Sequence, residues 1–198
     1  MFVYEKKLQY PVRIKNSNPK LAAAIISQYG GPDGELGASL RYLSQRYSMP
    51  YPELKGMLTD IGTEELGHLE MVGTIVHQLT RNLTEQQIKD AGFEAYFVDH
   101  TTGVFPQFAS GYPWSAATMQ VTGDTIADLT EDLAAEQKAR VTYDNILRLS
   151  DDPDVTDAIR FLRAREIVHF QRFGEWLRLV KYRLGEKNVY YMNPSFDQ

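Results

Sequence analysis

Two Glu-x-x-His motifs are the residues of this sequence with the clearest chemical use. The first consists of Glu65 and His68, and the second of Glu166 and His169. Residues three apart on a helix lie on one face, so each pair can bind a metal ion together. Carboxylate and imidazole groups suit both manganese and iron, and they do not choose between the two metals.

A further glutamate, Glu35 or Glu136, precedes each motif by 30 residues. Every member of the second set follows its counterpart by 101 residues, and Tyr143 follows Tyr42 at the same distance. The chain therefore contains two copies of one unit, a helix with an inward glutamate and then a helix with an inward Glu-x-x-His. A single such motif is usually a pair on a helix surface, but chance does not explain a duplicated set at matched spacing.

Apolar residues at alternating spacings of four and three surround both motifs, a pattern typical of the inner face of a bundle helix. The two apolar seams comprise Leu54, Leu58, Ile61, Glu65, His68, Val72, Ile75 and Leu79, and Val155, Ile159, Leu162, Glu166, His169, Phe173, Trp176 and Val180. Buried carboxylates without compensation would each cost several kcal/mol. Two divalent cations would balance four such charges, so we predict a dinuclear metal site in the core.

Prolines and glycines mark the ends of four predicted helices in an all-α bundle. Asn18-Pro19 is a typical helix start. Gly30-Gly31-Pro32 should interrupt this first helix, which resumes through Glu35 to about Tyr47. The other helices are expected at about 52–79, 124–149 and 153–182.

A single domain is expected over residues 1–198. It has an extended lead-in at 1–18, a long central connection at 91–123 and a tail at 183–198. The connection is rich in Gly, Pro and aromatic residues, and one short helix is expected near Glu85. Connections this long are uncommon in compact domains and are usually functional.

The overall composition excludes several classes of function. The net charge of −5 argues against nucleic acid and membrane surfaces as partners, because there is no basic excess to bind phosphates. Cysteine is absent, which excludes disulfides, thiolate nucleophiles and cysteine-ligated metals. Neither a signal peptide nor a membrane-spanning run is visible, so an intracellular protein is expected.

Some polar residues near the motifs have more than one interpretation. Tyr42 and Tyr143 lie two turns after the first glutamate of each unit, as plain core residues or as hydrogen-bond donors to a ligand carboxylate. Arg140 lies on an apolar seam, where it is expected to pair with a ligand carboxylate or with Glu166.

The other acidic residues and histidines near the motifs are expected to lie outside the site. Glu64 and Glu70 are assigned to the solvated helix face. His77 is assigned to the surface or to an interface, and His100 to the long connection.

Residues 60–70 (DIGTEELGHLE) and 113–124 (PWSAATMQVTGD) resemble the manganese catalase family, as do residues 127–129 and 134–140. The similarity extends from about Pro19 to Tyr182. The short length and the lead-in are most similar to the spore-coat branch of that family. The resemblance implies a ferritin-like four-helix bundle and the disproportionation of hydrogen peroxide to water and oxygen.

By this resemblance, two manganese ions bind per chain, with iron as the other possible metal. Glu35 and His68 would bind one ion, Glu136 and His169 the other, and Glu65 would bridge them. Glu166 would lie outside the direct ligands as a proton carrier, although the letters also fit a pattern in which it is a ligand. Tyr42 is assigned a catalytic role beside Glu166.

The family also implies a larger assembly and one departure at the site. A homo-hexamer is expected, and some members bind calcium at a subunit interface, to which Asp60 could contribute. Some members carry an arginine where this chain has Ala135, so a more open metal site is expected here.

Two other functions remain open at this point. One is a ferritin-like di-iron oxidase or iron-handling protein. The other is a mainly structural spore-coat protein, with other coat proteins as partners. The location would then be the cytoplasm or the spore coat.

Overall fold

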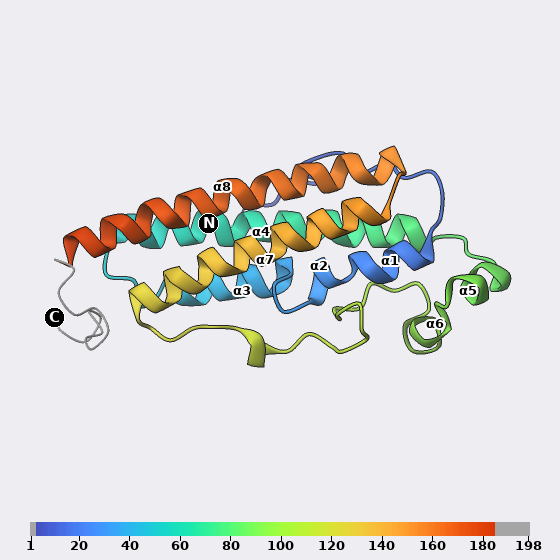
Figure 1. The fold of residues 1–198 in the computed structure, drawn as a ribbon, viewed down its shortest axis with the longest axis horizontal. Coiled ribbons are helices and arrows are strands. Elements are labelled where there is room, and N and C mark those ends of the chain that lie inside the picture. Colours follow the sequence, from blue (N-terminus) through green and yellow to red (C-terminus); the bar gives the residue numbers. More distant parts are fainter. Residues whose placement is uncertain (1–2, 185–198) are drawn as a thin grey trace.

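The computed structural model describes residues 3–184, which form a bundle of helices with one isolated β-bridge (Figure 1). The elements are α1 (Pro19–Ile25), α2 (Ser27–Gly30), α3 (Glu35–Gln45), α4 (Pro52–Thr80), α5 (Glu85–Ala91), α6 (Glu94–His100), the 3₁₀ helix η1 (Ala116–Thr118), α7 (Thr125–Leu149) and α8 (Pro153–Arg183). The predicted all-α four-helix bundle is confirmed. The predicted tail lies outside the described residues from position 185 onward.

The first rod of the bundle is built from three helices in a row, α1, α2 and α3 (Figure 1). Asn18 caps α1 by accepting a hydrogen bond from the Leu21 amide at 3.0 Å, and Pro19 occupies the first turn. The predicted interruption follows Gly30, and α3 begins at Glu35. The interruption therefore places Glu35 in the first turn of a new helix, in the interior of the bundle.

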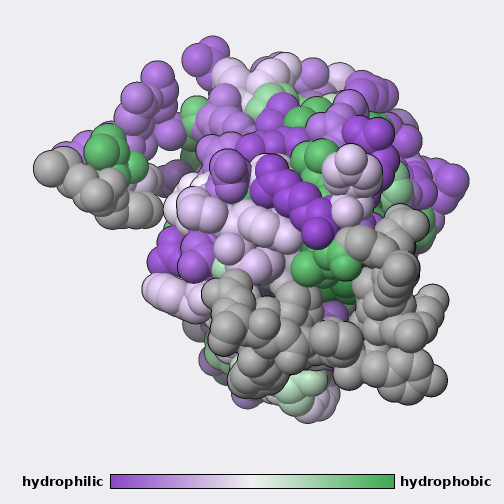
Figure 2. Space-filling model, turned by 90° about the vertical axis from the view of Figure 1, so that its left-hand side faces the viewer, coloured by the Kyte–Doolittle hydropathy of each residue, from purple (hydrophilic) through white to green (hydrophobic). Residues whose placement is uncertain are grey.

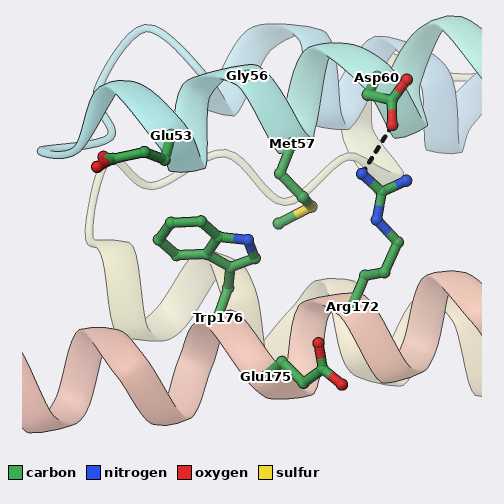
Figure 3. A pocket seen from close by; sticks show the side chains of 7 residues that line it. All are labelled: Glu53, Gly56, Met57, Asp60, Arg172, Glu175 and Trp176. Atoms are coloured by element: carbon green, nitrogen blue, oxygen red, sulfur yellow. Dashed lines mark hydrogen bonds and ion pairs between the residues drawn. The ribbon is translucent and has the colours of Figure 1, made fainter.

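The four rods pair as two halves. Helix α3 packs along α4, and α7 packs along α8. Two apolar clusters fill the interior, one around Val72 and Ile159 and the other around Leu58 and Phe173. Every predicted seam residue of α4 and α8 is buried except Trp176, which is half-buried beside a surface groove between those helices (Figure 3).

The central connection contains two short helices, α6 and the 3₁₀ helix η1, that we did not predict. After α6 the chain runs back along the side of α1–α3 to the start of α7 (Figure 1). Its fold depends on local bonds: the Tyr96 hydroxyl donates to the Gly103 carbonyl at 2.5 Å and accepts from the Phe105 amide at 2.8 Å. The Trp114 amide donates to the Pro106 carbonyl at 2.8 Å.

The lead-in lies across α4 and α8 instead of extending away from the bundle. Tyr10 stacks on Phe161 of α8 with ring centroids 4.7 Å apart. The Gln78 side chain of α4 bonds the lead-in backbone at Val12 and Ile14. These contacts tie the two motif helices together from outside.

One end of the bundle has a mainly polar surface. Figure 2 shows the end of the bundle at the left of Figure 1, where polar side chains dominate and apolar ones form smaller patches. Between residues 3 and 184, no helix has the length and apolar character needed to cross a membrane.

Candidate metal centre

Six carboxylate and imidazole residues meet in the middle of the bundle, and all are at most 2% exposed. They come from all four rods: Glu35 from α3, Glu65 and His68 from α4, Glu136 from α7, and Glu166 and His169 from α8. Their ligand atoms form two groups, each with all atoms within 4.8 Å: Glu35, Glu65, His68 and Glu166, and Glu65, Glu136 and His169. Glu65 belongs to both groups, so the arrangement is that of two adjoining sites with one shared carboxylate.

Glu65 lies between the two histidines. Its Oε2 is 2.6 Å from Nδ1 of His68, and its Oε1 is 2.8 Å from Nδ1 of His169. The two imidazoles stack with ring centroids 5.6 Å apart. Both Nδ1 atoms therefore face Glu65 at the centre of the cluster, and both Nε2 atoms point away from it.

Glu64 lies against the outer edges of both imidazoles, with a hydrogen bond to His169 and a longer ion-pair contact to His68, so its assignment to a solvated face was wrong. Its carboxylate lies 3.5 Å from Nε2 of His68 and 3.1 Å from Nε2 of His169. Arg165 donates to both Glu64 oxygens, at 2.7 and 3.2 Å, and Gln9 of the lead-in donates to Oε1 at 2.8 Å. Groups of this kind fix the orientation and the protonated nitrogen of a metal-binding histidine.

The 101-residue duplication is the sequence feature from which the role of Glu64 could have been inferred. Arg165 lies 101 residues after Glu64, so the two residues occupy equivalent positions in the two halves. Equivalent positions of the inner helices face each other across the bundle, as His68 and His169 do. A glutamate opposite an arginine at such a position predicts an ion pair beside the site, not two solvated side chains.

The two tyrosines cross between the halves. The Tyr42 hydroxyl donates to Glu136 Oε1 at 2.5 Å, and the Tyr143 hydroxyl donates to Glu35 Oε1. Burial, and then the neighbouring carboxylate, raise the pKa of each phenol well above its ordinary value, so both stay protonated donors. Both tyrosines are also fully buried core residues, so the two interpretations of them hold together.

The electrostatics of the cluster favour protons on the histidines and on some carboxylates. Burial lowers the pKa of His68, but Glu65 and Glu64 outweigh it and raise the pKa to about 10. Burial is likewise outweighed at His169, where Glu65 and Glu136 raise the pKa to about 12. Burial, and then Glu65, raise the pKa of Glu35 well above its ordinary value.

Glu65 and Glu166 occupy equivalent positions, but their environments differ. The two histidines hold the pKa of Glu65 below its ordinary value, against the opposing effect of burial. Burial, and then the charge of Glu35, raise the pKa of Glu166 well above its ordinary value. Glu65 contacts Nδ1 of both imidazoles, and Oε1 of each of these two glutamates has no hydrogen-bond partner within residues 3–184. The pair therefore separates into one central carboxylate and one that favours a proton.

The cluster fits two transition-metal ions. Glu65 Oε1, Glu136 Oε2, Glu166 Oε1 and His169 Nδ1 are buried without a hydrogen-bond partner in the described part of the chain. The 2.8 Å approach of Glu65 Oε1 to His169 Nδ1 thus lacks hydrogen-bond geometry. Di-iron and di-manganese bundles use the same donor set: one glutamate from each of two helices, and a Glu-x-x-His motif from each of the other two.

Other sequence candidates lie outside this cluster. The prediction that Arg140 pairs with a ligand carboxylate or with Glu166 was wrong, because its guanidinium bonds Gln137 and Asp144 on its own helix. The Asp60 carboxylate pairs with Arg172 at 2.7 Å in the groove of Figure 3.

The remaining predicted residues are also away from the cluster. His77 is exposed, Glu70 accepts a hydrogen bond from Tyr4, and His100 stacks on Phe105. Ala135 is buried, at 3% exposure.

Comparison with known proteins gives consistent matches over nearly the whole chain. The sequence model of manganese containing catalase matches residues 1–190. Protein CotJC of Bacillus subtilis (strain 168) is 52% identical over 190 residues, which are 96% of this chain and 100% of the relative. A probable manganese catalase of Clostridium acetobutylicum is 38% identical over 184 residues, 91% of this chain and 81% of the relative.

Solved structures agree with these matches. The crystal structure of wild-type KatB, a manganese catalase from Anabaena, has a TM-score of 0.85 at 34% identity, covering 91% of this chain and 81% of that chain. A dodecameric thioferritin from Bacteroides fragilis has a TM-score of 0.56 at 15% identity, over 88% and 90% of the two chains, and shows likeness of fold alone. Fold and cluster together define a ferritin-like bundle with a buried carboxylate–histidine centre. The chain belongs to the family of manganese-containing catalases.

Proposed function

We propose that this protein is a manganese catalase that converts two molecules of hydrogen peroxide into two of water and one of dioxygen. The observation that carries the proposal is the buried pair of ligand groups that share Glu65, in a chain of this family. A single metal ion would leave part of this donor set without a partner, whereas two ions would use both groups.

Each half of the bundle contributes to both metal positions. Glu35 and His68 would hold one ion, Glu136 and His169 the other, and Glu65 would contact both. When bound, the two manganese ions would supply the redox chemistry, accepting two electrons from one peroxide and returning them to the next. Carboxylate and imidazole ligands also suit iron, and family membership favours manganese.

Glu166 is the residue best suited to carry protons. The peroxide that becomes dioxygen releases two protons, and the peroxide that becomes water takes up two, so protons must be kept near the site between the two events. Glu166 is fully buried, its pKa is raised, and its Oε1 is free to face a bound molecule. These properties support a role as the acid and base of the reaction.

Tyr42, Tyr143 and Glu64 act on the ligands instead of on the substrate. Each tyrosine holds one carboxylate oxygen of Glu136 or Glu35 and leaves the second oxygen for a metal. Glu64 hydrogen-bonds Nε2 of His169 and lies 3.5 Å from Nε2 of His68, opposite the Nδ1 atoms that face the centre. Tyr42, which we had assigned a catalytic role, is on this geometry a positioning residue for Glu136.

We also propose a homo-oligomer, a hexamer by family analogy, located in the spore coat or the cytoplasm. Ile167, Val168 and Phe170 of α8 are 37–43% exposed, which supports an apolar contact surface on this helix. The full-length match to CotJC, compared with 81% of the probable catalase, supports a short branch of the family. Light scattering on the purified protein would measure the assembly.

The test of the function is metal analysis combined with oxygen evolution. Protein expressed with manganese and iron both available should contain two manganese ions per chain and evolve oxygen from peroxide. The Glu166→Gln variant should keep its manganese and lose most of the activity. Full manganese loading without oxygen evolution would contradict the enzymatic proposal and favour a structural role, whereas iron occupancy with ferroxidase activity would favour the iron-handling alternative.

A further inference from the structure

A second group of buried polar residues lies between α3 and α7, apart from the metal ligands. It consists of Arg41 and Gln45 on α3 and Thr125 and Asp132 on α7. Arg41 is 1% exposed and the other three are 0% exposed. We call these four residues the Arg41–Asp132 cluster.

Most polar atoms of this cluster have no hydrogen-bond partner in the described part of the chain. They are Nε and Nη1 of Arg41, both carboxylate oxygens of Asp132, Oε1 of Gln45 and Oγ1 of Thr125. Arg41 uses only Nη2, which lies 3.3 Å from the Pro32 carbonyl and 3.8 Å from Asp33. Buried polar groups in native proteins are almost always paired, and a small molecule supplies the partner where the chain does not.

Asp132 lies within the electrostatic reach of Gln45 and Arg41. Burial raises the pKa of Asp132 well above its ordinary value, and the Gln45 side chain and the Arg41 charge oppose that effect from nearby. The Gln45 amide donates to the Gln120 carbonyl, and neither Asp132 oxygen has a hydrogen bond of good geometry within residues 3–184. A molecule that both accepts and donates hydrogen bonds can connect them.

The end of the long connection covers this cluster. The Gln45 amide donates to the Gln120 carbonyl at 2.9 Å. Asp128, one turn from Asp132, accepts hydrogen bonds from the backbone of Thr122 and Gly123. The connection itself is largely exposed at residues 116–122. The cluster therefore lies one layer below the surface.

The cluster also adjoins the metal centre. Asp132 lies one helical turn before Glu136, and Arg41 directly precedes Tyr42, whose hydroxyl bonds Glu136. Glu136 and then Asp132 act together on the Tyr42 phenol and raise its pKa, so both carboxylates are near that ring. The cluster thus lies between the connection and the Tyr42–Glu136 side of the metal centre.

We propose that Arg41, Gln45 and Asp132 bind hydrogen peroxide beside the metal centre, with water in its place between turnovers. The proposal rests on the proposed catalase function. Hydrogen peroxide donates two hydrogen bonds and accepts several, which matches the carboxylate and amide oxygens on one side and the guanidinium on the other. Water satisfies the same atoms, so this site would collect substrate on the path from the connection to Tyr42.

A double variant tests the site by removing both of its ionisable side chains. In Arg41→Met/Asp132→Leu both become apolar side chains of similar length, and Asp33, the ion-pair partner of Arg41, keeps its shorter contact with Lys138. We expect full manganese content, an unchanged Tm and a fall in kcat/KM for peroxide of about tenfold, mostly through KM. The control, Arg140→Met/Asp144→Leu, removes an Arg–Asp pair outside the cluster, whose aspartate also pairs with Arg163 of α8. It should keep kcat/KM within about twofold.

The possible results distinguish a failure of this peroxide site from a failure of the proposed catalase function. Ordered oxygen atoms between Arg41 and Asp132 in a crystal structure of the manganese-loaded protein, together with the KM effect, would support the proposal. An unchanged kcat/KM in the fully loaded double variant would overturn it, and so would a loss of activity that only follows a loss of manganese. If the parent evolves no oxygen, the catalase proposal fails. Peroxide soaked into its crystals then decides, because two-atom density in the cluster supports the site and its absence overturns it.

Discussion

Glu64 carries the most information at the scale of single residues. It directly precedes the predicted ligand Glu65, and its carboxylate contacts both histidines, Arg165 and Gln9 of the lead-in. Ligand types and spacing predict which residues can meet at the centre, because the donor set is chemically unusual on an apolar seam. They do not predict what bonds the outer edges of the ligands, because that depends on how α4 and α8 are rotated against each other.

We expect Glu64→Gln to weaken manganese binding by about 10- to 100-fold, because one carboxylate oxygen lies beside each imidazole and the amide replaces one of them with a donor NH₂ group. Competition with a fluorescent chelator would measure the affinity. Glu70→Gln is the matched control, a glutamate of the same helix whose carboxylate accepts a hydrogen bond from Tyr4 near the surface. Equal affinities of the two variants would contradict the role of Glu64.

Manganese binding should release protons. Without metal, the pKa of His68 is raised to about 10 and that of His169 to about 12, so both imidazoles carry an extra proton at neutral pH. Binding at Nδ1 requires that proton to leave, so affinity should rise with pH, by about tenfold per pH unit for each proton released.

Calorimetry between pH 6 and 8 in buffers of different ionisation enthalpy would count these protons. A binding enthalpy that does not change with the buffer would contradict the expected release. An affinity that falls as pH rises over this range would contradict it equally.

At the scale of elements, the helix ends were largely predictable and the connection was not. Proline, glycine and capping residues mark α1, α4, α7 and α8, because their backbone effects are local. Helix α6 escaped prediction because the aromatic and glycine residues around it are typical of loops. Its partners, such as the contact of Tyr96 with Gly103 and Phe105, are visible only in three dimensions.

Gly30 is where the connection meets the first rod. A methyl group at this position would overlap the backbone of Pro106 and Gln107. We expect Gly30→Ala to lower the free energy of unfolding by about 1–3 kcal/mol, since two backbones would have to separate. Gly56→Ala, in the exposed part of α4 where nothing lies within 4 Å, should instead raise it by about 0.5–1 kcal/mol.

Urea unfolding of both glycine variants at a fixed free manganese concentration would measure these changes. The close approach at Gly30 would be contradicted if both substitutions were stabilising.

At the scale of the whole molecule, the sequence predicts the duplication, but it does not predict which side chains of one half contact the other half. The 101-residue offset predicts that equivalent residues lie around a common centre. It does not tell whether Tyr42 bonds the glutamate of its own half or that of the other. The structure shows the second arrangement, so both tyrosines join the two halves.

Because the two tyrosines are equivalent, Tyr42→Phe and Tyr143→Phe should have similar effects. Each removes a buried hydrogen bond to a carboxylate, which contributes about 1–3 kcal/mol. We expect a loss of that size in unfolding free energy for each variant, together with weaker manganese binding. A neutral result for one tyrosine and a large loss for the other would show that the two bonds are not equivalent.

The ion pair of Glu64 with Arg165 affects how the two halves of the chain associate during folding. A protein made of two similar halves risks pairing two first halves, or two second halves, from different molecules during synthesis. Two first halves in this geometry would set Glu64 against Glu64, and two second halves would set Arg165 against Arg165, each with like charges facing one another beside the core. The association of unlike halves alone yields attraction, so this single position favours monomeric closure over exchange of halves between chains.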